Sequence, residues 1–232
     1  VTSGCTFVMA TSSNIHNCIA NNDGGGVINH GTFQMRGGTI STCTTVAFGG
    51  GGVCNNGTFI MSDGMIKACT SPDGQYASGG GVRNSNQFTM TGGMIGDPDN
   101  ENDASHVYNT SSQETTLTIS GNAKIYTDIT NVGILNADGG EIAGTMTNDT
   151  NRYGTGSEGA AGSTEFHGKV TNTGTIRKGT FKNEVINESS GTINGGTFTG
   201  AITNNDGMVL DGDFSGATLN GMLVITFDPN NG

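Results

Sequence analysis

The chain has 232 residues, of which 41 are glycine, and only 32% are apolar, 6% aromatic and 12% charged. Its formal net charge of −11 argues against a nucleic-acid or anionic-membrane surface, because no basic stripe exists to release counterions from phosphate. No apolar run approaches the roughly 18 residues of a membrane span. We therefore expect no nucleic-acid partner and no membrane insertion.

Internal repetition is the strongest signal in the chain, and it begins at Val1. Aligned copies starting at Val1, Val27, Val53 and Val82 place identical apolar residues in columns. The columns hold Phe7, Phe33, Phe59 and Phe88; Met9, Met35, Met61 and Met90; and Ile15, Ile40, Ile66 and Ile95. Positions whose residue type varies between the copies alternate with these apolar positions. This alternation predicts that the repeated segments are strands.

The stretch GGGVINHGTFQM, from Gly24 to Met35, contains a GxxxxGT that is similar to a phosphate-binding loop. It lacks the lysine that such a loop needs at position 31 or 32, and no helical pattern follows it. The same motif recurs at Gly50 and, with less exact agreement, at Gly79. We therefore interpret these glycines as turns between strands.

A second pattern, an apolar residue two positions before an asparagine, joins the two halves of the chain. The asparagines are Asn29, Asn55, Asn84, Asn109, Asn131, Asn148, Asn172, Asn187 and Asn204, with Asn220 ending the series. Asparagine tolerates left-handed backbone at a corner, and its amide can bond to the amide of the next unit. Later phenylalanines are assigned to the same stack as the first four, namely Phe166, Phe181, Phe198 and Phe214.

A unit of three short strands joined by Gly- and Asn-rich corners cannot bury its own apolar face, whereas parallel stacking of such units can. The prediction is an all-β chain folded as a right-handed parallel β-helix, or β-solenoid, of about eleven coils. One domain covers residues 1–221, with wide coils over 1–145 and narrow coils over 146–221. Residues 222–232 are expected to be a linker or the start of a following module.

The repeat GGGVxNxGTFxMxGGxI resembles the pectate-lyase-like group of right-handed parallel β-helices. More narrowly, it resembles the glycine-rich repeats of large secreted or wall-attached proteins from gut Firmicutes, and this resemblance covers nearly the whole chain. The final stretch VITFDPNNG, from Val224 to Gly232, is similar to the opening of the Listeria-Bacteroides repeat of internalin-like surface proteins. These resemblances imply a bacterial protein that is secreted or on the cell surface, with further modules covalently linked to this one.

The acidic stretch GDPDNEND, from Gly96 to Asp103, is the candidate cation site. It places oxygen ligands for calcium at alternate positions: Asp97, Asp99, Glu101 and Asp103. It lacks the central glycine and the final glutamate of an EF-hand, and a solvated acidic loop is the alternative interpretation. No other cofactor is expected.

Three insertions interrupt the repeat, over Thr70–Ser78, Asp97–Glu114 and Asp149–Glu165. Loops on a rigid scaffold commonly carry binding functions. One tyrosine falls in each insertion, and Tyr76, Tyr108 and Tyr153 are therefore candidate ligand-binding residues that stack on sugars. Ordinary exposed tyrosines are the alternative.

The five cysteines show no CxxC metal spacing, but Cys18, Cys43 and Cys69 each follow an isoleucine by three residues. This spacing predicts a stack of thiols on successive coils. The sequence leaves two alternatives open: buried small side chains, or a disulfide between neighbouring coils.

The expected function is a non-enzymatic stalk or adhesin module that binds host or dietary glycans or surface proteins through its loops. The alternative is a fragment of a carbohydrate-active enzyme, a polysaccharide lyase or hydrolase on the same fold. The Gly-His-Gly and Arg-Ile-Lys motifs of the related hydrolases are absent from the sequence, and no acid–base pair follows from spacing. No catalytic residue is therefore assigned.

Overall fold

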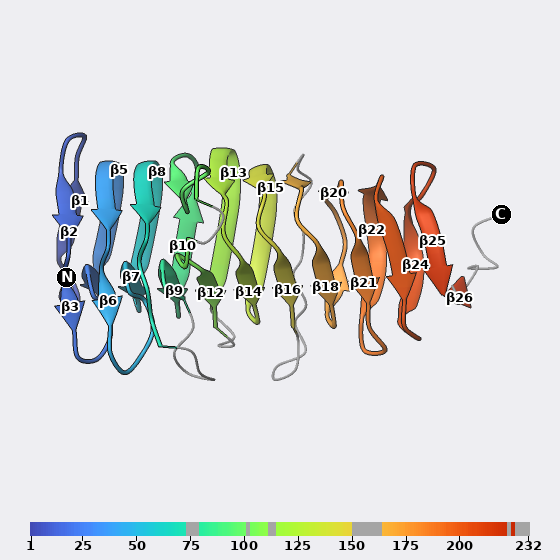
Figure 1. Ribbon diagram of the computed structural model, residues 1–232, viewed down its shortest axis with the longest axis horizontal. Coiled ribbons are helices and arrows are strands. Elements are labelled where there is room, and N and C mark those ends of the chain that lie inside the picture. The colour runs from blue at the N-terminus through green and yellow to red at the C-terminus, as the bar shows by residue number, and fades with distance from the viewer. Residues whose placement is uncertain (73–78, 101–102, 111–114, 150–163, 222–223, 226–232) are drawn as a thin grey trace.

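A computed structural model describes residues 1–72, 79–100, 103–110, 115–149, 164–221 and 224–225. These residues form 26 strands and no helix, arranged as a rod with successive coils side by side along its length (Figure 1). Every strand pair is parallel. The fold is a parallel β-solenoid, as the repeat predicted.

The larger of two long sheets follows a main path of eleven strands, in agreement with the expected number of coils. Its fourteen strands are β1 (Thr6–Met9), β2 (Asn14–His16), β5 (Thr32–Ser41), β8 (Thr58–Lys67), β10 (Gln87–Met90), β11 (Met94–Ile95), β13 (Thr116–Ile125), β15 (Ile134–Ile142), β17 (Glu165–Phe166), β19 (Thr175–Ile176), β20 (Thr180–Phe181), β22 (Thr192–Phe198), β24 (Met208–Asp213) and β26 (Val224–Ile225).

The second long sheet has ten short strands, and a third sheet has two. The ten are β4 (Val27–Asn29), β7 (Val53–Asn55), β9 (Val82–Asn84), β12 (Val107–Asn109), β14 (Ile129–Asn131), β16 (Met146–Asn148), β18 (Val170–Asn172), β21 (Val185–Asn187), β23 (Ala201–Asn204) and β25 (Thr218–Gly221). The pair is β3 (Ile19–Ala20) with β6 (Thr44–Thr45).

Two columns of core residues run along the larger sheet, and the phenylalanines lie in the first column near the amino end and in the second near the carboxyl end. The first column runs through Phe7, Phe33, Phe59, Phe88, Leu117 and Leu135, and continues near the carboxyl end with Ile176, Ile193 and Val209. The second runs through Ile15, Ile40, Ile66, Ile95, Ile125, Ile142, Phe166, Phe181 and Phe198.

The prediction of one phenylalanine stack was therefore wrong. Phe7 to Phe88 stack in the first column, whereas Phe166 to Phe198 stack in the second, where Phe214 packs on Phe198. Where one column carries a ring, the other carries an aliphatic side chain. Two rings of one coil are thus never placed opposite each other, which avoids overpacking of the interior.

An asparagine ladder lies on the ten-stranded sheet, and all nine asparagines from Asn29 to Asn204 are buried. In each step the side-chain Nδ2 donates to Oδ1 of the next asparagine, at 2.7 to 2.9 Å. Asn220 does not extend the ladder, contrary to the prediction. Its backbone pairs with Thr203, whereas Asn204 pairs with Gly221, so Asn220 faces outward and is exposed.

The glycine triplets stack backbone on backbone, since Gly26 donates its amide to the Gly51 carbonyl at 3.0 Å. A Cβ on Gly51 would overlap the carbonyl oxygens of Thr70 and Gly80 in the next coil. These glycines therefore allow close contact between coils. This packing accounts for the glycines of the GxxxxGT motif without a bound phosphate.

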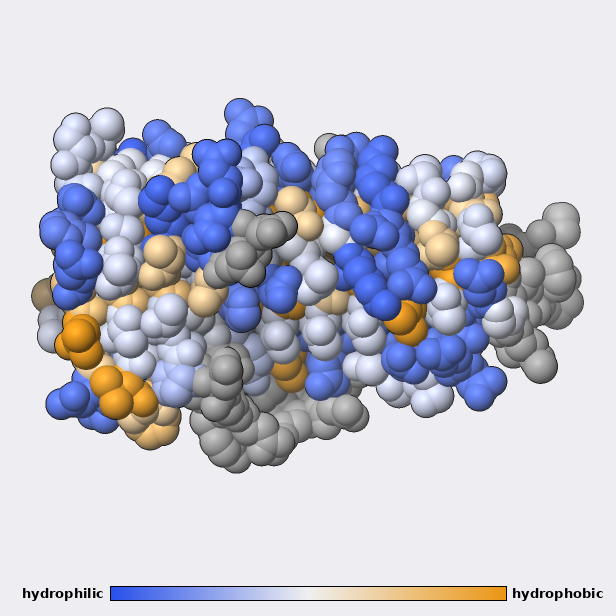
Figure 2. Space-filling model, in the orientation of Figure 1, coloured by the Kyte–Doolittle hydropathy of each residue, from blue (hydrophilic) through white to orange (hydrophobic). Residues whose placement is uncertain are grey.

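Exposed large apolar side chains of the described residues are concentrated in the coils near the two ends of the rod. Figure 2 shows a mostly hydrophilic or neutral face with apolar residues gathered near the amino-terminal end. They are Phe7, Val8, Ile19, Ile28, Val46 and Phe48 near that end, and Met208, Leu210 and Leu219 near the other.

Coil lengths follow the prediction in outline, because ladder steps fall from 26 and 29 residues at Asn29 and Asn55 to 15 and 17 at Asn172 and Asn187. Val224 and Ile225 pair with Met208 and Val209, so the larger sheet includes a short strand after residue 221.

Candidate functional site

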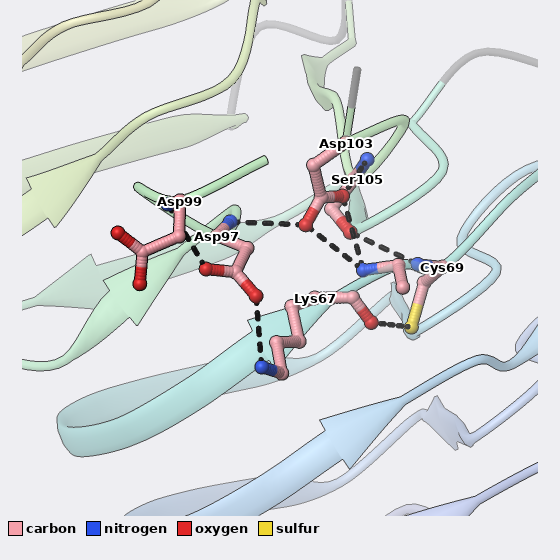
Figure 3. Close-up of polar contacts among 7 residues, drawn as sticks. Lys67, Cys69, Asp97, Asp99, Asp103 and Ser105 are labelled. Carbon is pink, nitrogen blue, oxygen red and sulfur yellow. Dashed lines mark hydrogen bonds and ion pairs between the residues drawn. The ribbon is translucent and has the colours of Figure 1, made fainter. Parts of the chain in front are cut away.

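The structure describes some of the predicted ligand residues and leaves others outside the described ranges. Tyr76, Tyr153 and Glu101 fall outside the described residues. The three aspartates of the acidic stretch follow β11, beside the corner after β8 in the preceding coil (Figure 3).

Asp103 is buried, with 6% of its surface exposed, and its carboxylate accepts hydrogen bonds from backbone amides. Oδ1 accepts from Ser105 at 2.8 Å and Oδ2 from Asp97 at 2.9 Å, while the Ala68 amide lies 3.0 Å from both oxygens. Ala68 has a φ of 51°, so the corner that Asp103 binds is left-handed. Asp103 therefore ties the acidic stretch to the preceding coil (Figure 3).

Asp97 forms an ion pair with Lys67, in which Nζ lies 2.8 Å from Oδ2. The hydrogen bond from Lys67 lowers the pKa of Asp97, and Asp97 raises that of Lys67 in turn. Oδ1 of Asp97 accepts the amide of Asp99, whose own side chain is exposed. A cation at Asp97 and Asp99 would thus compete with Lys67 for the first carboxylate.

The calcium prediction stays open at this point, because Glu101 is not described. Within the described ranges, no three His, Cys, Asp or Glu side chains are grouped so that they could hold a metal ion. Both oxygens of Asp103 are already bonded to amides. The described geometry gives Asp103 a role in the fold.

Tyr108 lies at the outward position of β12, near the middle of the ten-stranded sheet, and is half-buried. Its register partners are Arg83 on one side and Thr130 on the other. Nε of Arg83 is buried and makes no hydrogen bond within the part of the chain that the structure describes. A tyrosine ring beside a guanidinium and a hydroxyl offers stacking and hydrogen-bonding groups to a ligand such as a sugar. The sequence singled out Tyr108 but not Arg83.

A second group of polar side chains, which the sequence analysis missed, lies on the larger sheet. This charged row consists of Lys124, Glu141, Glu165, His167 and Lys182. Lys124, Glu141 and Glu165 are successive register partners, and Nζ of Lys124 lies 3.1 Å from Glu141. Glu165 contacts Lys182 at 3.3 Å and His167 at 3.2 Å.

The charged row borders an open hollow of about 330 Å³, lined by Lys124, Glu141 and Glu165 and by Gly121–Ala123 of β13 and Gly140 of β15. Hydrogen bonds from Lys182 and then His167 lower the pKa of Glu165, which therefore stays ionised at neutral pH. An ionised, paired carboxylate suits ligand binding better than the proton donation that a general acid must perform.

The signal for the charged row is present in the sequence but depends on strand register. Lys124, Glu141 and Glu165 each directly precede a residue of the second core column, at Ile125, Ile142 and Phe166. Assigning Phe166 to the wrong column concealed this alignment.

Comparisons with protein-family models, with curated proteins and with solved structures found no match to the chain. In the described residues, no helix is long and apolar enough to cross a membrane. The function therefore has to be inferred from the site itself.

Proposed function

We propose that this chain is a non-enzymatic stalk or adhesin module of a secreted or cell-surface bacterial protein, which binds host or dietary glycans or surface proteins. The observation that carries the proposal is the continuous asparagine ladder. Its eight bonds run from Asn29 to Asn204 without a break. Such a buried, fully bonded network favours one rigid arrangement, as a spacer requires. The glycine-rich repeat and the VITFDPNNG ending support linkage to further modules.

Glycans are the ligand class that we put first, and Arg83 and Tyr108 are the residues that we assign to contact them. Their neighbouring outward positions on β9 and β12 offer an aromatic surface beside a cation and the hydroxyl of Thr130. Sugar rings have one apolar face to stack on tyrosine and hydroxyl groups to bond with arginine. β12, which carries Tyr108, lies within the insertion expected over Asp97–Glu114.

A glycan array of neutral and acidic oligosaccharides, probed with and without calcium, tests the proposal. For any glycan retained, Tyr108→Ala is expected to weaken binding at least about tenfold, equivalent to 1.4 kcal/mol. The matched control is Tyr126→Ala, which removes a half-buried tyrosine after β13, on the other long sheet. Equal losses in the two variants, or no retention of any glycan, would contradict glycan binding by Tyr108.

A carbohydrate-active enzyme is the second candidate, and the charged row with its hollow is the observation that favours it. Two carboxylates on neighbouring coils, beside two lysines and a histidine, are residue types that cleave or eliminate glycosidic bonds. The assay is release of reducing ends from the glycans on the array. Release that Glu141→Gln and Glu165→Gln both abolish would establish the enzyme and overturn the stalk; retention without release supports adhesion.

A further inference from the structure

Three cysteines occupy the same corner of three consecutive coils. The amide of Thr44 donates to the Cys18 carbonyl at 2.8 Å, and that of Thr70 donates to the Cys43 carbonyl at 2.9 Å. Cys18 is thus beside Cys43, and Cys43 is beside Cys69. All three are free thiols in the structure.

The three corners share one backbone conformation, and this aligns the thiols. The residue before each cysteine has a left-handed φ, of 56° at Asn17, 54° at Thr42 and 51° at Ala68. Each thiol also points at the carbonyl two residues back in its own coil, as Cys43 does to Ser41 at 3.3 Å.

Cys43 lies between its two neighbours, because the backbone bonds of Thr44 and Thr70 place Cys18 in the coil before it and Cys69 in the coil after it. Successive coils of a solenoid are about 4.8 Å apart, and a disulfide joins Cα atoms that lie about 4.4 to 6.8 Å apart. The Cβ atoms of a disulfide are only about 3.8 Å apart, so Cys43 has to move toward one neighbour and away from the other. The stack of three thiols can therefore form one disulfide and leaves one thiol free.

We propose that this stack is a redox modification site, in which Cys18 and Cys43 form a disulfide by exchange with a low-molecular-weight disulfide such as glutathione disulfide. Exposure decides between the two pairs. Cys18 is partly exposed, whereas Cys43 and Cys69 have no exposed surface. Within the stack, only Cys18 can meet the reagent in the folded protein.

The reaction has two exchange steps. The Cys18 thiolate attacks one sulfur of glutathione disulfide, forms a mixed disulfide and releases one glutathione. The Cys43 thiolate then attacks Sγ of Cys18 and releases the second glutathione. In total, two protein thiols lose two protons and two electrons, and one glutathione disulfide is reduced to two glutathiones.

The two buried thiols differ from Cys18 in their reactivity. Burial raises the pKa of Cys43, so the second step is the slow one and the Cys18–glutathione adduct accumulates before the cross-link appears. Burial raises the pKa of Cys69 to about 12, which leaves almost no thiolate at neutral pH. Cys69 therefore remains the free thiol of the stack.

The cross-link would fasten the first coil to the second. The first coil is otherwise paired on one side only, since β1, β2 and β3 each pair with a single strand of the next coil. Edge elements of this kind open first in native proteins. Oxidation is therefore expected to slow amide exchange in β1 to β3 by about tenfold or more, with little change beyond β9.

The test treats folded protein carrying Cys5→Ser, which removes the exposed cysteine outside the stack, with glutathione disulfide at neutral pH. Intact mass and peptide mapping are expected to show the Cys18 adduct first, followed by loss of two hydrogens in total and a Cys18–Cys43 peptide. Cys43→Ser is expected to stop the reaction at the adduct, because Cys18 and Cys69 are two coils apart. The matched control Cys69→Ser is expected to give the same cross-link as its parent.

Chemical blocking of Cys18 tests the same reaction without a substitution, so the result does not depend on a variant that folds. Brief iodoacetamide treatment of the folded parent protein alkylates Cys18, and cross-linking is then expected to disappear. The proposal is overturned if the parent protein retains the Cys18 adduct indefinitely, if Cys69→Ser abolishes the cross-link, or if alkylated protein still loses two hydrogens.

Discussion

Nδ2 of Asn109 donates to Oδ1 of Asn131 at 2.7 Å in the middle of the solenoid, and neither residue has exposed surface. The same Nδ2 donates to the Ile134 carbonyl at 3.1 Å. Oδ1 of Asn109 accepts from Asn84 at 2.8 Å. One side chain thus satisfies buried polar groups in both neighbouring coils, as a buried amide must to avoid a desolvation penalty.

Replacing Asn109 with alanine is expected to lower the free energy of unfolding by about 3 to 5 kcal/mol. The change removes the hydrogen bonds to Oδ1 of Asn131 and to the Ile134 carbonyl, and each buried group that loses its partner costs about 1 to 3 kcal/mol. Nδ2 of Asn84 loses one acceptor but still donates to the carbonyls of Asn86 and Thr116. Urea denaturation measures the difference. Asn220→Ala is the control, expected to fall within about 0.5 kcal/mol of wild type because Asn220 is exposed and outside the ladder. A large effect at Asn220 would contradict the observed register.

Phe88→Ala is expected to destabilise the chain by about 3 to 5 kcal/mol, because it empties a fully buried position between two coils. The ring centroid of Phe88 lies 4.4 Å from that of Phe59. Phe7 caps the same stack but is 39% exposed, so Phe7→Ala should cost clearly less. Similar losses of stability in the two variants, measured by thermal and urea denaturation, would show that the stack does not end at Phe7 in solution.

In a parallel solenoid, equivalent residues of successive coils pair with one another. The columns and the ladder could therefore be predicted, because aligning the repeats gives the strand register. The two errors have one cause. Where the unit shortens, a column can no longer be followed by residue type. Phe166 resembles Phe88 but aligns with Ile142, and Asn220 resembles Asn204 but follows Leu219, the residue that aligns with Ile202.

The candidate site was less accessible to sequence reasoning, since it depends on outward positions that the repeat leaves variable. Tyr108 could be found from its insertion, but its partner Arg83 could be found only from the pairing of β9 with β12. The role of Asp103 was hidden for another reason. The carboxylate oxygens of Asp103 accept hydrogen bonds from backbone amides, and the sequence does not indicate which backbone amides need a side-chain acceptor.

Stability is expected to fall as the pH rises from about 9 toward 12, with a reductant present. Burial raises the pKa of Cys69 from 9.0 to about 12, so the folded protein keeps this proton in a range where the unfolded chain has released it. The unfolded state then binds fewer protons, and the free energy of unfolding drops by up to about 1.4 kcal/mol per pH unit for this thiol.

Urea denaturation at pH 8 and pH 10 checks this dependence. Cys69→Ser is expected to flatten it, since serine does not titrate in this range. Cys5→Ser, at an exposed position outside the stack, is the control for the general effect of replacing a cysteine with serine. Burial also raises the pKa of Cys43 and Cys54, so part of the dependence will persist in Cys69→Ser. A rise in stability with pH over this interval would contradict the assignment.

Asp103→Asn is expected to destabilise the chain by about 2 to 4 kcal/mol whether or not calcium is present. The amide keeps the shape of the carboxylate but turns an NH₂ group toward a backbone donor, Asp97 or Ser105, and it removes charge from the bonds that remain. Asp99→Asn alters an exposed side chain in the same stretch and should be close to neutral without calcium. Thermal denaturation of both variants, with calcium and with a chelator, separates the two roles of this stretch. If calcium raises the melting temperature of the wild type but not of Asp99→Asn, the stretch binds the ion; if Asp103→Asn matches the wild type in chelator, its carboxylate does not hold the corner.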